Sequence, residues 1–522
     1  MSSARLPSTD RPAEPFAVGV LATAKQSFGD VWKQWPQRTE IADEEGRVQT
    51  VWRQPTLSNP WSQFRMLNWK AWCHFIVGFI CWTADAYDFH ALTINTTQIA
   101  AHFDCSNTVI STAITLTLLL RSVGAVIFGL PGDRWGCIIP LVFNLVVLGA
   151  LQIGTIYANS LGTFFAVRSL FGLFMGGVFG NAASTAMENC PPEARGLVSG
   201  IFQQGYSFGF VLAACMSLSF KNRPESWKSA LYVGTGFSVL AGVLASFLLK
   251  GERRELKSKR SGRELPSLSD FWKKTKTMLK SSWRNFFFCV FFMTFFNYFS
   301  HTSQDSYTTF MIESKGLARG AALHASIWMK TGACVGGPIH GWFSQWFGRR
   351  RTIMQASLCA ACCIVGWILP KSETVLSITG FMIQFFIQGA WGVIPVHLNE
   401  LAPPAFRSTF PGLTYQLGNA LSSPSTQIVN AIAERVYVKD ARGPHVKGYG
   451  PVMGVATAII ATGIFLIAMV GPERRGRNFD EELPAGADFD SGAARERDVE
   501  SGPRGGSSDK GITVMEMEET KR

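Results

Sequence analysis

The chain repeats itself at a fixed distance of 212 residues. Several separate segments keep this spacing, and the matched pairs include Gly124 and Gly336, Gly129 and Gly341, Gly136 and Gly348, Glu188 and Glu400, Arg195 and Arg407, and Gly200 and Gly412. A spacing that is held across separate segments indicates two copies of one structural unit. Apolar runs long enough to cross a bilayer lie between these segments. The sequence therefore predicts a duplicated membrane bundle, in which a functional site lies between the two halves.

The composition agrees with a membrane protein. Only 16% of the 522 residues are charged and 47% are hydrophobic, whereas soluble proteins carry about 25% charged residues. An apolar stretch of about 20 residues spans a bilayer as a helix. We therefore predict an all-α membrane protein with twelve transmembrane helices in two pseudo-symmetric six-helix bundles. The predicted spans are 69–94, 108–130, 138–158, 161–187, 196–219, 228–250, 285–311, 320–343, 351–370, 374–399, 409–432 and 450–471.

The basic residues predict the orientation. Residues 250–284 contain twelve Lys and Arg against four acids, and three arginines lie between spans 8 and 9. By the positive-inside rule, both termini and the central loop are cytoplasmic, although four bases before span 12 depart from the rule. The net charge of +12 suits anionic lipid rather than nucleic acid. The predicted domains are a cytoplasmic tail (1–68), a first bundle (69–250), a basic cytoplasmic loop (251–283), a second bundle (284–472) and a disordered cytoplasmic tail (473–522).

Two further features concern partners. The eleven cysteines lie mostly within spans, so we interpret them as packing residues and expect no metal site and no cofactor. Lys510 and Lys521 in the C-terminal tail are candidate sites for the ubiquitination machinery.

The turn between spans 2 and 3 carries the motif GLPGDRWG over residues 129–136, with Asp133 and Arg134 at its centre. The motif resembles the loop signature of the major facilitator superfamily of secondary transporters. Its glycines allow two helices to approach closely, and its acid can cap a helix or pair with a base. The second copy has Gln345 where the signature has an acid, and the first copy has Cys137 where it has a base.

The Glu-x-x-Pro-Pro-x-x-Arg segments lie at the predicted cytoplasmic ends of spans 4 and 10. We interpret them as gating latches between helix ends, and simple loop caps are the alternative interpretation. Arg168 in span 4 belongs to another element that resembles the superfamily. The predicted gating residues are Asp133, Arg134, Arg168, Glu188, Arg195, Arg349, Glu400 and Arg407.

Two cations fall at a similar depth in equivalent spans. Arg121 lies in span 2, and the repeat shift maps it to position 333, one helical turn from Lys330 in span 8. A charge at the bilayer centre costs about 2.5–3.5 kcal/mol on insertion scales, so it normally faces a cavity. We predict that both cations face a shared cavity and bind an anion, because guanidinium can hold a carboxylate through two hydrogen bonds. Alternatively, each cation pairs with an acid such as Asp85 or Asp88 in span 1.

Span 7 begins as a Phe-rich segment and then becomes polar. Asn297, His301 and Asp305 are spaced by four residues, so they share one helix face, which is predicted to lie in the outer half of the span. Histidine titrates near physiological pH, so the His301–Asp305 pair can take up a proton from an acidic exterior. A structural hydrogen bond that closes the outer gate is the alternative.

The same segment, Asn297-x-x-Ser300-His301-x-Ser303-Gln304-Asp305-x-x-x-Thr309, resembles the signature of the fungal Jen-type monocarboxylate permeases, which are lactate/pyruvate:proton symporters. The resemblance extends from about span 1 to span 12 and implies proton-coupled uptake of short monocarboxylates across the plasma membrane. Together with the two cations, it gives the predicted substrate-binding residues Arg121, Phe208, Asn297, Ser300, His301, Ser303, Gln304, Lys330, Gln416 and Asn419. It also implies that Thr309 belongs to the transport path.

These observations predict a carrier that works by alternating access, in which a carboxylate lies between Arg121 and the polar face of span 7. The predicted proton-coupling residues are His301, Asp305, Asp85 and Asp88. The sequence has no metal-ligand spacing and no nucleophile–base pattern, so we do not predict an enzyme. Two alternatives remain, namely transport of another organic anion such as a dicarboxylate or sialate, and a sensor that binds carboxylate without transporting it.

Overall fold

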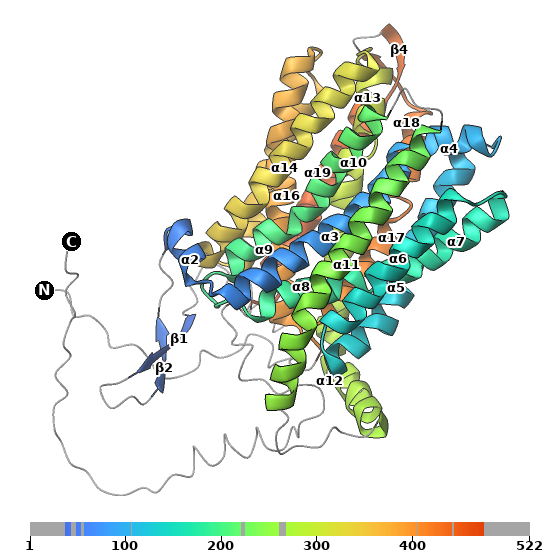
Figure 1. Ribbon diagram of the computed structural model, residues 1–522. Helices are drawn as coiled ribbons and strands as arrows, with labels where there is room; N and C mark the ends of the chain where they lie inside the picture. The colour runs from blue at the N-terminus through green and yellow to red at the C-terminus, as the bar shows by residue number, and fades with distance from the viewer. Residues whose placement is uncertain are drawn as a thin grey trace, which may run out of the picture.

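The computed structural model of the chain describes residues 37–42, 48–53, 57–105, 107–220, 225–259, 268–403, 406–440, 443–473 and 475. Long helices that run in similar directions form its body (Figure 1). Each predicted span coincides with one helix or with two consecutive helices.

The first bundle follows a short helix that precedes the first span. That short helix is α2 (Pro60–Met66), and the helices of the bundle are α3 (Trp69–Ile94), α4 (Thr96–His102), α5 (Asn107–Trp135), α6 (Ile138–Ile156), α7 (Leu161–Met175), α8 (Val178–Glu188), α9 (Arg195–Gln203), α10 (Gly205–Ser219) and α11 (Ser226–Lys259). Span 4 is interrupted between α7 and α8 at Gly176 and Gly177, and span 5 is interrupted between α9 and α10 at Gln204.

The second bundle has the same order of long helices. Its helices are α12 (Leu268–Gln304), α13 (Tyr307–Glu313), α14 (Arg319–Phe347), α15 (Arg349–Ile368), α16 (Glu373–Leu401), α17 (Thr409–Ser422), α18 (Ser425–Ala433) and α19 (Tyr449–Val470). The bundles meet where α5 and α8 contact α17, and where α9 and α10 contact α14. The larger cluster of buried hydrophobic residues contains members of both bundles.

By length and composition, seven of the described helical segments are apolar enough to cross a membrane. They are Thr112–Trp135, Ile138–Ile156, Leu161–Glu188, Trp227–Leu248, Arg349–Ile368, Glu373–Leu401 and Tyr449–Val470. The other five predicted spans coincide with α3, α9–α10, α12, α14 and α17–α18. These helices are interrupted or carry the polar residues of the candidate site, which lowers their apolar character.

The backbone reproduces the sequence repeat. Gly136 and Gly348 end the two copies of the motif, and both adopt a positive φ, of 102° and 100°. Gly124 and Gly336 mark equally close helix contacts, because an added Cβ would lie 1.7 Å from the Leu173 carbonyl oxygen and 2.0 Å from that of Phe385. Leu173 and Phe385 are themselves separated by 212 residues. The two bundles are therefore copies of one packing arrangement.

Two short antiparallel hairpins add to the helices. β1 (Gln37–Ala42) pairs with β2 (Val48–Arg53), and β3 (Tyr437–Asp440) pairs with β4 (Gly443–Lys447) before α19.

The predicted basic loop 251–283 is partly helical, because α11 continues to Lys259 and α12 begins at Leu268. Its many Lys, Arg and Glu residues favour helix, which explains the difference. Residues 260–267 and most of both predicted tails, with Lys510 and Lys521, lie outside the described residues.

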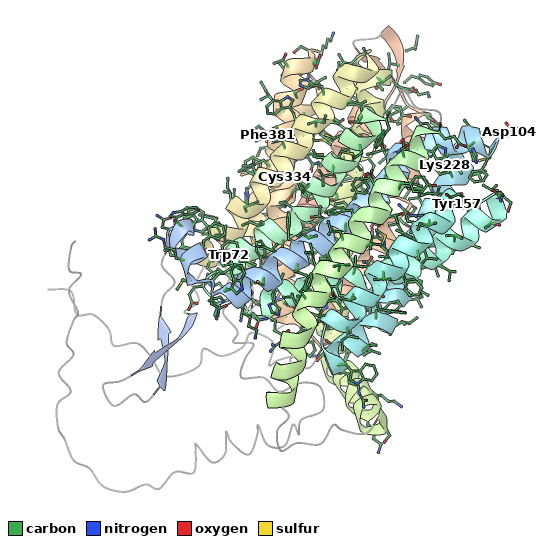
Figure 2. All side chains as sticks on the ribbon, in the orientation of Figure 1. Trp72, Asp104, Tyr157, Lys228, Cys334 and Phe381 are labelled. Atoms are coloured by element: carbon green, nitrogen blue, oxygen red, sulfur yellow. The ribbon has the colours of Figure 1, made fainter. Side chains whose placement is uncertain are left out.

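The two ends of the bundles need separate names. We call the end that carries the turns after α5, α8, α14 and α16 the paired-turn end, and the other end the opposite end. In Figure 2, Trp72 lies toward the paired-turn end, whereas Asp104 and Tyr157 lie at the opposite end.

Candidate substrate and proton site

At the paired-turn end, two equivalent residues join the bundles. Asp133 on α5 accepts hydrogen bonds from the backbone N–H groups of Ser408 (2.7 Å) and Thr409 (3.0 Å) at the start of α17. Its repeat counterpart, Gln345 on α14, donates to the backbone carbonyl of Pro192 at 2.8 Å. Each side chain thus reaches from its own bundle into the other one, although one is an acid and the other an amide.

The two copies of the Glu-x-x-Pro-Pro-x-x-Arg segment are held differently. In the second bundle, Arg349 and the buried Glu400 form an ion pair. Arg349 Nη2 lies 3.0 Å from Glu400 Oε1, and Arg349 Nε lies 3.1 Å from Glu400 Oε2. In the first bundle, Glu188 is exposed. Arg195 caps its own turn, because its Nε donates to the Cys190 carbonyl at 3.0 Å. The first copy therefore contains a local cap, and the second contributes an acid to a buried ion pair.

Two other predicted gating residues also lie at this end. The backbone carbonyl of Arg407 accepts a hydrogen bond from Ser184 Oγ of the first bundle at 2.7 Å. The guanidinium carbon of Arg134 lies 5.4 Å from the centroid of the Trp135 ring. Arg407 thus helps to join the bundles through its main chain.

Arg168 and Asp88 form a separate buried cluster toward the opposite end of the first bundle. Gln152 connects them, because its Nε2 donates to Asp88 Oδ1 at 3.3 Å and its Oε1 accepts from Arg168 Nη1 at 3.1 Å. Ser238 Oγ donates to Asp88 Oδ2 at 2.6 Å. Arg168 therefore lies away from the other predicted gating residues and close to a predicted proton-coupling residue.

Arg121 on α5 is buried beside an acid of α3. Its Nη2 lies 3.8 Å from Asp85 Oδ2 and also contacts Met175 Sδ, and its guanidinium carbon lies 5.1 Å from the centroid of Phe89. Within the described part of the chain, neither Asp85 oxygen accepts a hydrogen bond and Arg121 Nε has no acceptor. The pairing alternative therefore holds for this cation, but the contact is a loose ion pair that leaves hydrogen-bonding groups unused.

Lys330 on α14 is buried at the interface between the bundles. Its Nζ donates to Gln304 Oε1 at 2.5 Å and lies 4.7 Å from the ring centroid of Phe210, which belongs to α10 of the first bundle. Among the described residues, no carboxylate lies within ion-pair distance of this ammonium. Lys330 is therefore a buried cation whose contacts are an amide oxygen and an aromatic face.

The predicted His301–Asp305 pair is formed near the end of α12. His301 Nδ1 lies 2.9 Å from Asp305 Oδ2, and its Nε2 lies 3.2 Å from Asn419 Oδ1 on α17. Thr426 Oγ1 also donates to Asp305 Oδ2 at 2.9 Å. This network connects the ends of α12, α17 and α18, and the proton-coupling and the gate interpretations both stay predictions.

The other polar residues of α12 divide between two directions. Ser300 and Ser303 accept hydrogen bonds from the side-chain amides of Gln388 (3.0 Å) and Gln384 (2.9 Å) on α16. Asn297 donates to its own helix, at the Met293 carbonyl. The two hydroxyls join α12 to α16 and the Asn297 amide stays within its own helix, whereas Gln304 and His301 face Lys330 and Asn419.

Three predicted residues remain to be located. Gln416 is fully buried on α17, and neither polar atom of its side-chain amide has a partner in the described part of the chain. Phe208 is 43% exposed and stacks on Phe79, so the structure does not bring it to the two cations. Thr309 is half-buried in α13.

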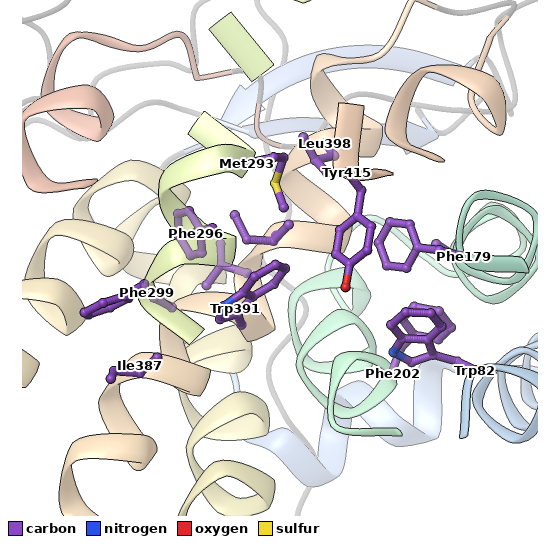
Figure 3. Packing of buried hydrophobic residues seen from close by; sticks show 14 of the residues in the cluster. Trp82, Phe179, Phe202, Met293, Phe296, Phe299, Ile387, Trp391, Leu398 and Tyr415 are labelled. Carbon is purple, nitrogen blue, oxygen red and sulfur yellow. The ribbon is translucent and has the colours of Figure 1, made fainter. Parts of the chain in front are cut away.

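An aromatic layer crosses the bundle interface on the paired-turn side of these polar groups. Tyr415 stacks on Phe179 with ring centroids 4.2 Å apart, and the rings of Trp82 and Trp391 approach Tyr415 edge-on at 6.1 and 5.7 Å. Figure 3 shows Tyr415 between Phe179 and Trp391, with the Trp82 and Phe202 rings beside it. Phe179 and Trp82 belong to the first bundle, and Tyr415 and Trp391 to the second. This layer closes the interface toward the paired-turn end.

The sequence prediction missed several residues at this interface. Phe210, rather than Phe208, meets Lys330, and the layer depends on Tyr415 and Trp391. His90 is also buried there between rings of α10. The available signal was their place on helices that carry other predicted site residues.

Two helical bundles with ionisable groups at their interface define a helical membrane transporter. The chain belongs to the major facilitator superfamily, whose family profile matches residues 71–425. The predicted all-α fold and superfamily are confirmed. The protein is a multi-pass membrane transporter and not an enzyme.

The chain is also similar to individual transporters. A carboxylic acid transporter protein homolog of Saccharomyces cerevisiae is 30% identical over 446 residues, covering 81% of this chain and 72% of that protein. This similarity confirms the predicted resemblance. A probable 4-methylmuconolactone transporter of Cupriavidus pinatubonensis is 23% identical over 404 residues, covering 76% and 89%. The proton:xylose symporter XylE shares the fold, with a TM-score of 0.58 and 13% identity over 79% of this chain and 99% of that one.

Proposed function

We propose that this protein takes up short carboxylates such as lactate, pyruvate and acetate-like acids together with protons, by alternating access. The observation that carries the proposal is Lys330, a buried ammonium at the bundle interface with no carboxylate within ion-pair distance among the described residues. A buried charge without a counterion is costly, so such a group normally serves an ion or substrate. A bound carboxylate supplies the missing charge. The similarity to a carboxylic acid transporter homolog agrees with this cargo.

Arg121 supplies the second cation. Its 3.8 Å contact with Asp85 is too long for a hydrogen bond, and its Nε has no described acceptor. A substrate carboxylate can therefore displace Asp85 and accept two parallel hydrogen bonds from the guanidinium. Asp85 then loses its counterion and takes up a proton, so that substrate and proton enter together without an unpaired buried charge.

Asp88 and the His301–Asp305 pair provide further groups for the proton. Asp88 is connected to Arg168 through Gln152, and His301 is connected to Asn419 of another helix. Interacting groups of this kind titrate jointly, so we assign the proton to the set of His301, Asp305, Asp85 and Asp88 rather than to one residue.

We further propose that the protein works in the plasma membrane with both termini in the cytoplasm. The paired-turn end then faces the cytoplasm, since the basic turn that begins with Arg349 lies there. Asp133, Gln345 and the aromatic layer join the bundles at this end. The described conformation is accordingly closed toward the cytoplasm, and transport requires these contacts to separate.

A dicarboxylate is a second candidate cargo. Arg121 and Lys330 come from different bundles and contact different neighbours. Each cation can therefore bind one of the two carboxylates of a single molecule.

Uptake of labelled lactate, pyruvate, succinate and malate tests these proposals in cells that lack their own carboxylate permeases. We expect lactate or pyruvate to accumulate faster at pH 5 than at pH 7.5. Accumulation of succinate and malate alone would favour the dicarboxylate cargo. Saturable binding without flux would overturn transport and support a sensor.

A further inference from the structure

His90 on α3 has no role in the transport scheme above, yet it lies at the bundle interface. It is 8% exposed, and its ring lies against Tyr206 and Phe210 of α10 with centroids 4.8 and 5.1 Å apart. Its Nε2 has no hydrogen-bond partner in the described part of the chain. A buried ring nitrogen without a partner loses its hydrogen bond to water and gains none in return. Such an atom is suited to meet a ligand.

Phe210 connects His90 to the other bundle. The ring that contacts His90 on one side also lies 4.7 Å from the ammonium of Lys330. The imidazole of the first bundle and the ammonium of the second therefore share one aromatic neighbour. The ammonium donates to Gln304 but has no described carboxylate within ion-pair distance, so an imidazole nitrogen without a partner and an ammonium without a counterion, from opposite bundles, lie on the same aromatic ring.

The electrostatic surroundings of His90 also suit an anion. Lys330 on α14, Arg121 on α5 and His301 on α12 all interact with His90 electrostatically. These groups approach from three helices other than α3. An anion placed beside His90 is therefore attracted from both bundles at once.

The position is distinct from the Arg121–Asp85 pair. His90 follows Asp85 by five residues on α3, which is a rise of about 7.5 Å toward the opposite end. Under the orientation proposed above, an anion that enters from outside meets His90 and Lys330 before it meets Arg121.

We propose that His90 is a further substrate-binding residue, which together with Lys330 first holds the carboxylate of the incoming substrate across the bundle interface, before that carboxylate moves on to Arg121. Nε2 of the imidazole donates to one carboxylate oxygen, and the Lys330 ammonium donates to the other. This inference rests on the proposed carboxylate transport. It adds a contact from the first bundle that transport by Arg121 and Lys330 does not require.

His90→Phe tests the contact, because it keeps an aromatic ring against α10 and removes the nitrogen. We expect the KM for lactate to rise roughly tenfold, the effect of one lost hydrogen bond to a charged group, while Vmax and the amount at the cell surface stay unchanged. His90→Gln keeps an N–H donor and should restore part of the affinity. His74→Phe is the matched control, since His74 is similarly buried on α3 but lies about 24 Å away along the helix.

A double-mutant cycle separates ligand binding from packing. His90→Phe and Lys330→Gln each remove one contact to the same carboxylate, so their effects on KM should be less than multiplicative when combined. Independent effects, or a wild-type KM in His90→Phe, would overturn the role of His90 while leaving carboxylate transport intact. If His90→Phe does not reach the surface, His90→Leu, which also removes the nitrogen, takes its place in the cycle with Lys330→Gln and gives the same decision. Absence of lactate flux in the wild type would instead remove the underlying proposal.

Discussion

The two bundles are copies of one fold, but they place their charges differently. In the first bundle, buried opposite charges meet deep in the helices, where Arg121 lies near Asp85 and Arg168 reaches Asp88 through Gln152. At its paired-turn end, Glu188 is exposed. The second bundle does the reverse, since Arg349 and Glu400 form a buried pair at that end and Lys330 lies at the centre without a described carboxylate partner.

This difference indicates a division of roles between equivalent positions. A buried ion pair contributes little net stability, but breaking it by removing one partner is costly. The Arg349–Glu400 pair therefore fixes the geometry of the second bundle at the turn. Under the proposed transport, the loosely paired or unpaired central charges respond to an anion and a proton.

The largest expected effect concerns the central cation of the first bundle. Arg121→Ala removes two charge-assisted hydrogen bonds to the carboxylate, about 3 kcal/mol or more, and should lower kcat/KM for uptake roughly a hundredfold or further. Labelled lactate uptake, normalised to the protein at the cell surface, measures the effect. Lys330→Gln should cost less, roughly tenfold, because Arg121 remains. A larger loss for the lysine variant would reverse the proposed roles of the two bundles.

The buried turn pair of the second bundle gives the next effect, on stability. Arg349→Ala leaves Glu400 buried without its partner and should lower the free energy of unfolding by roughly 3–5 kcal/mol. Thermal unfolding of the purified protein in detergent measures the loss. Glu188→Ala, at the exposed counterpart of Glu400, serves as the control and should change little. Equal losses in the two variants would show that the turns are held alike.

His301→Ala sharpens the comparison of proton sites between the bundles. Removing the imidazole breaks the contacts to Asp305 and Asn419 and should bring the ratio of uptake at pH 5 to uptake at pH 7.5 close to one. Asp85→Asn provides the same measurement for the first bundle. An acid optimum retained in His301→Ala and lost in Asp85→Asn would assign the proton to the first bundle alone.

The 212-residue repeat in the sequence predicts those features of the two bundles that depend on the course of the backbone. The repeat predicted the bundles, and Gly136 and Gly348 share their positive φ because the turn they form is the same. The repeat also paired Asp133 with Gln345, and both join the bundles although their chemistry differs. Features set by backbone geometry are thus readable from spacing alone.

The sequence did not predict the features that depend on how each helix is rotated about its own axis. Phe208 was predicted to line the path, but Phe210 meets Lys330, because two residues along a helix turn a side chain to another face. Ser300 and Ser303 of α12 were predicted to bind substrate, but their hydroxyls accept hydrogen bonds from side-chain amides of α16. A single sequence does not specify how neighbouring helices are rotated, so it could not identify His90 or these partners.

A smaller effect is expected at the start of α15, where the second bundle has an additional contact. The carboxylate of Glu473, which follows α19, accepts hydrogen bonds from the backbone N–H groups of Arg349 (2.6 Å) and Arg350 (3.4 Å). The equivalent helix α6 has no side-chain cap at Cys137. Glu473→Gln should therefore lower the free energy of unfolding by about 0.5–2 kcal/mol, the usual range for a helix cap.

The pH dependence of this cap has a defined sign. Burial by itself raises the pKa of Glu473, but Arg475, Arg350 and the backbone N–H of Arg349 outweigh it, and the pKa lies below its ordinary value. Because the pKa of Glu473 is lower in the folded than in the unfolded protein, the cap contributes its full stabilisation above the unfolded pKa of about 4.3. The protein loses this stabilisation as the pH falls through the folded pKa. The difference between wild type and Glu473→Gln should be full at pH 7 and shrink below about pH 4. A difference that grows with acid would contradict the assignment.

The smallest effect is expected from giving the first bundle the charge that it lacks. Cys137→Arg places a guanidinium at the repeat position of Arg349, where Glu188 is the equivalent of Glu400. Because Glu188 is exposed, the new pair should be screened by solvent and add at most about 1 kcal/mol to the free energy of unfolding. Cys137→Lys is a matched control for charge without the planar guanidinium. A gain of several kcal/mol that Glu188→Gln abolishes would mean that the first bundle can bury this pair. The exposure of Glu188 would then result only from the missing base at position 137.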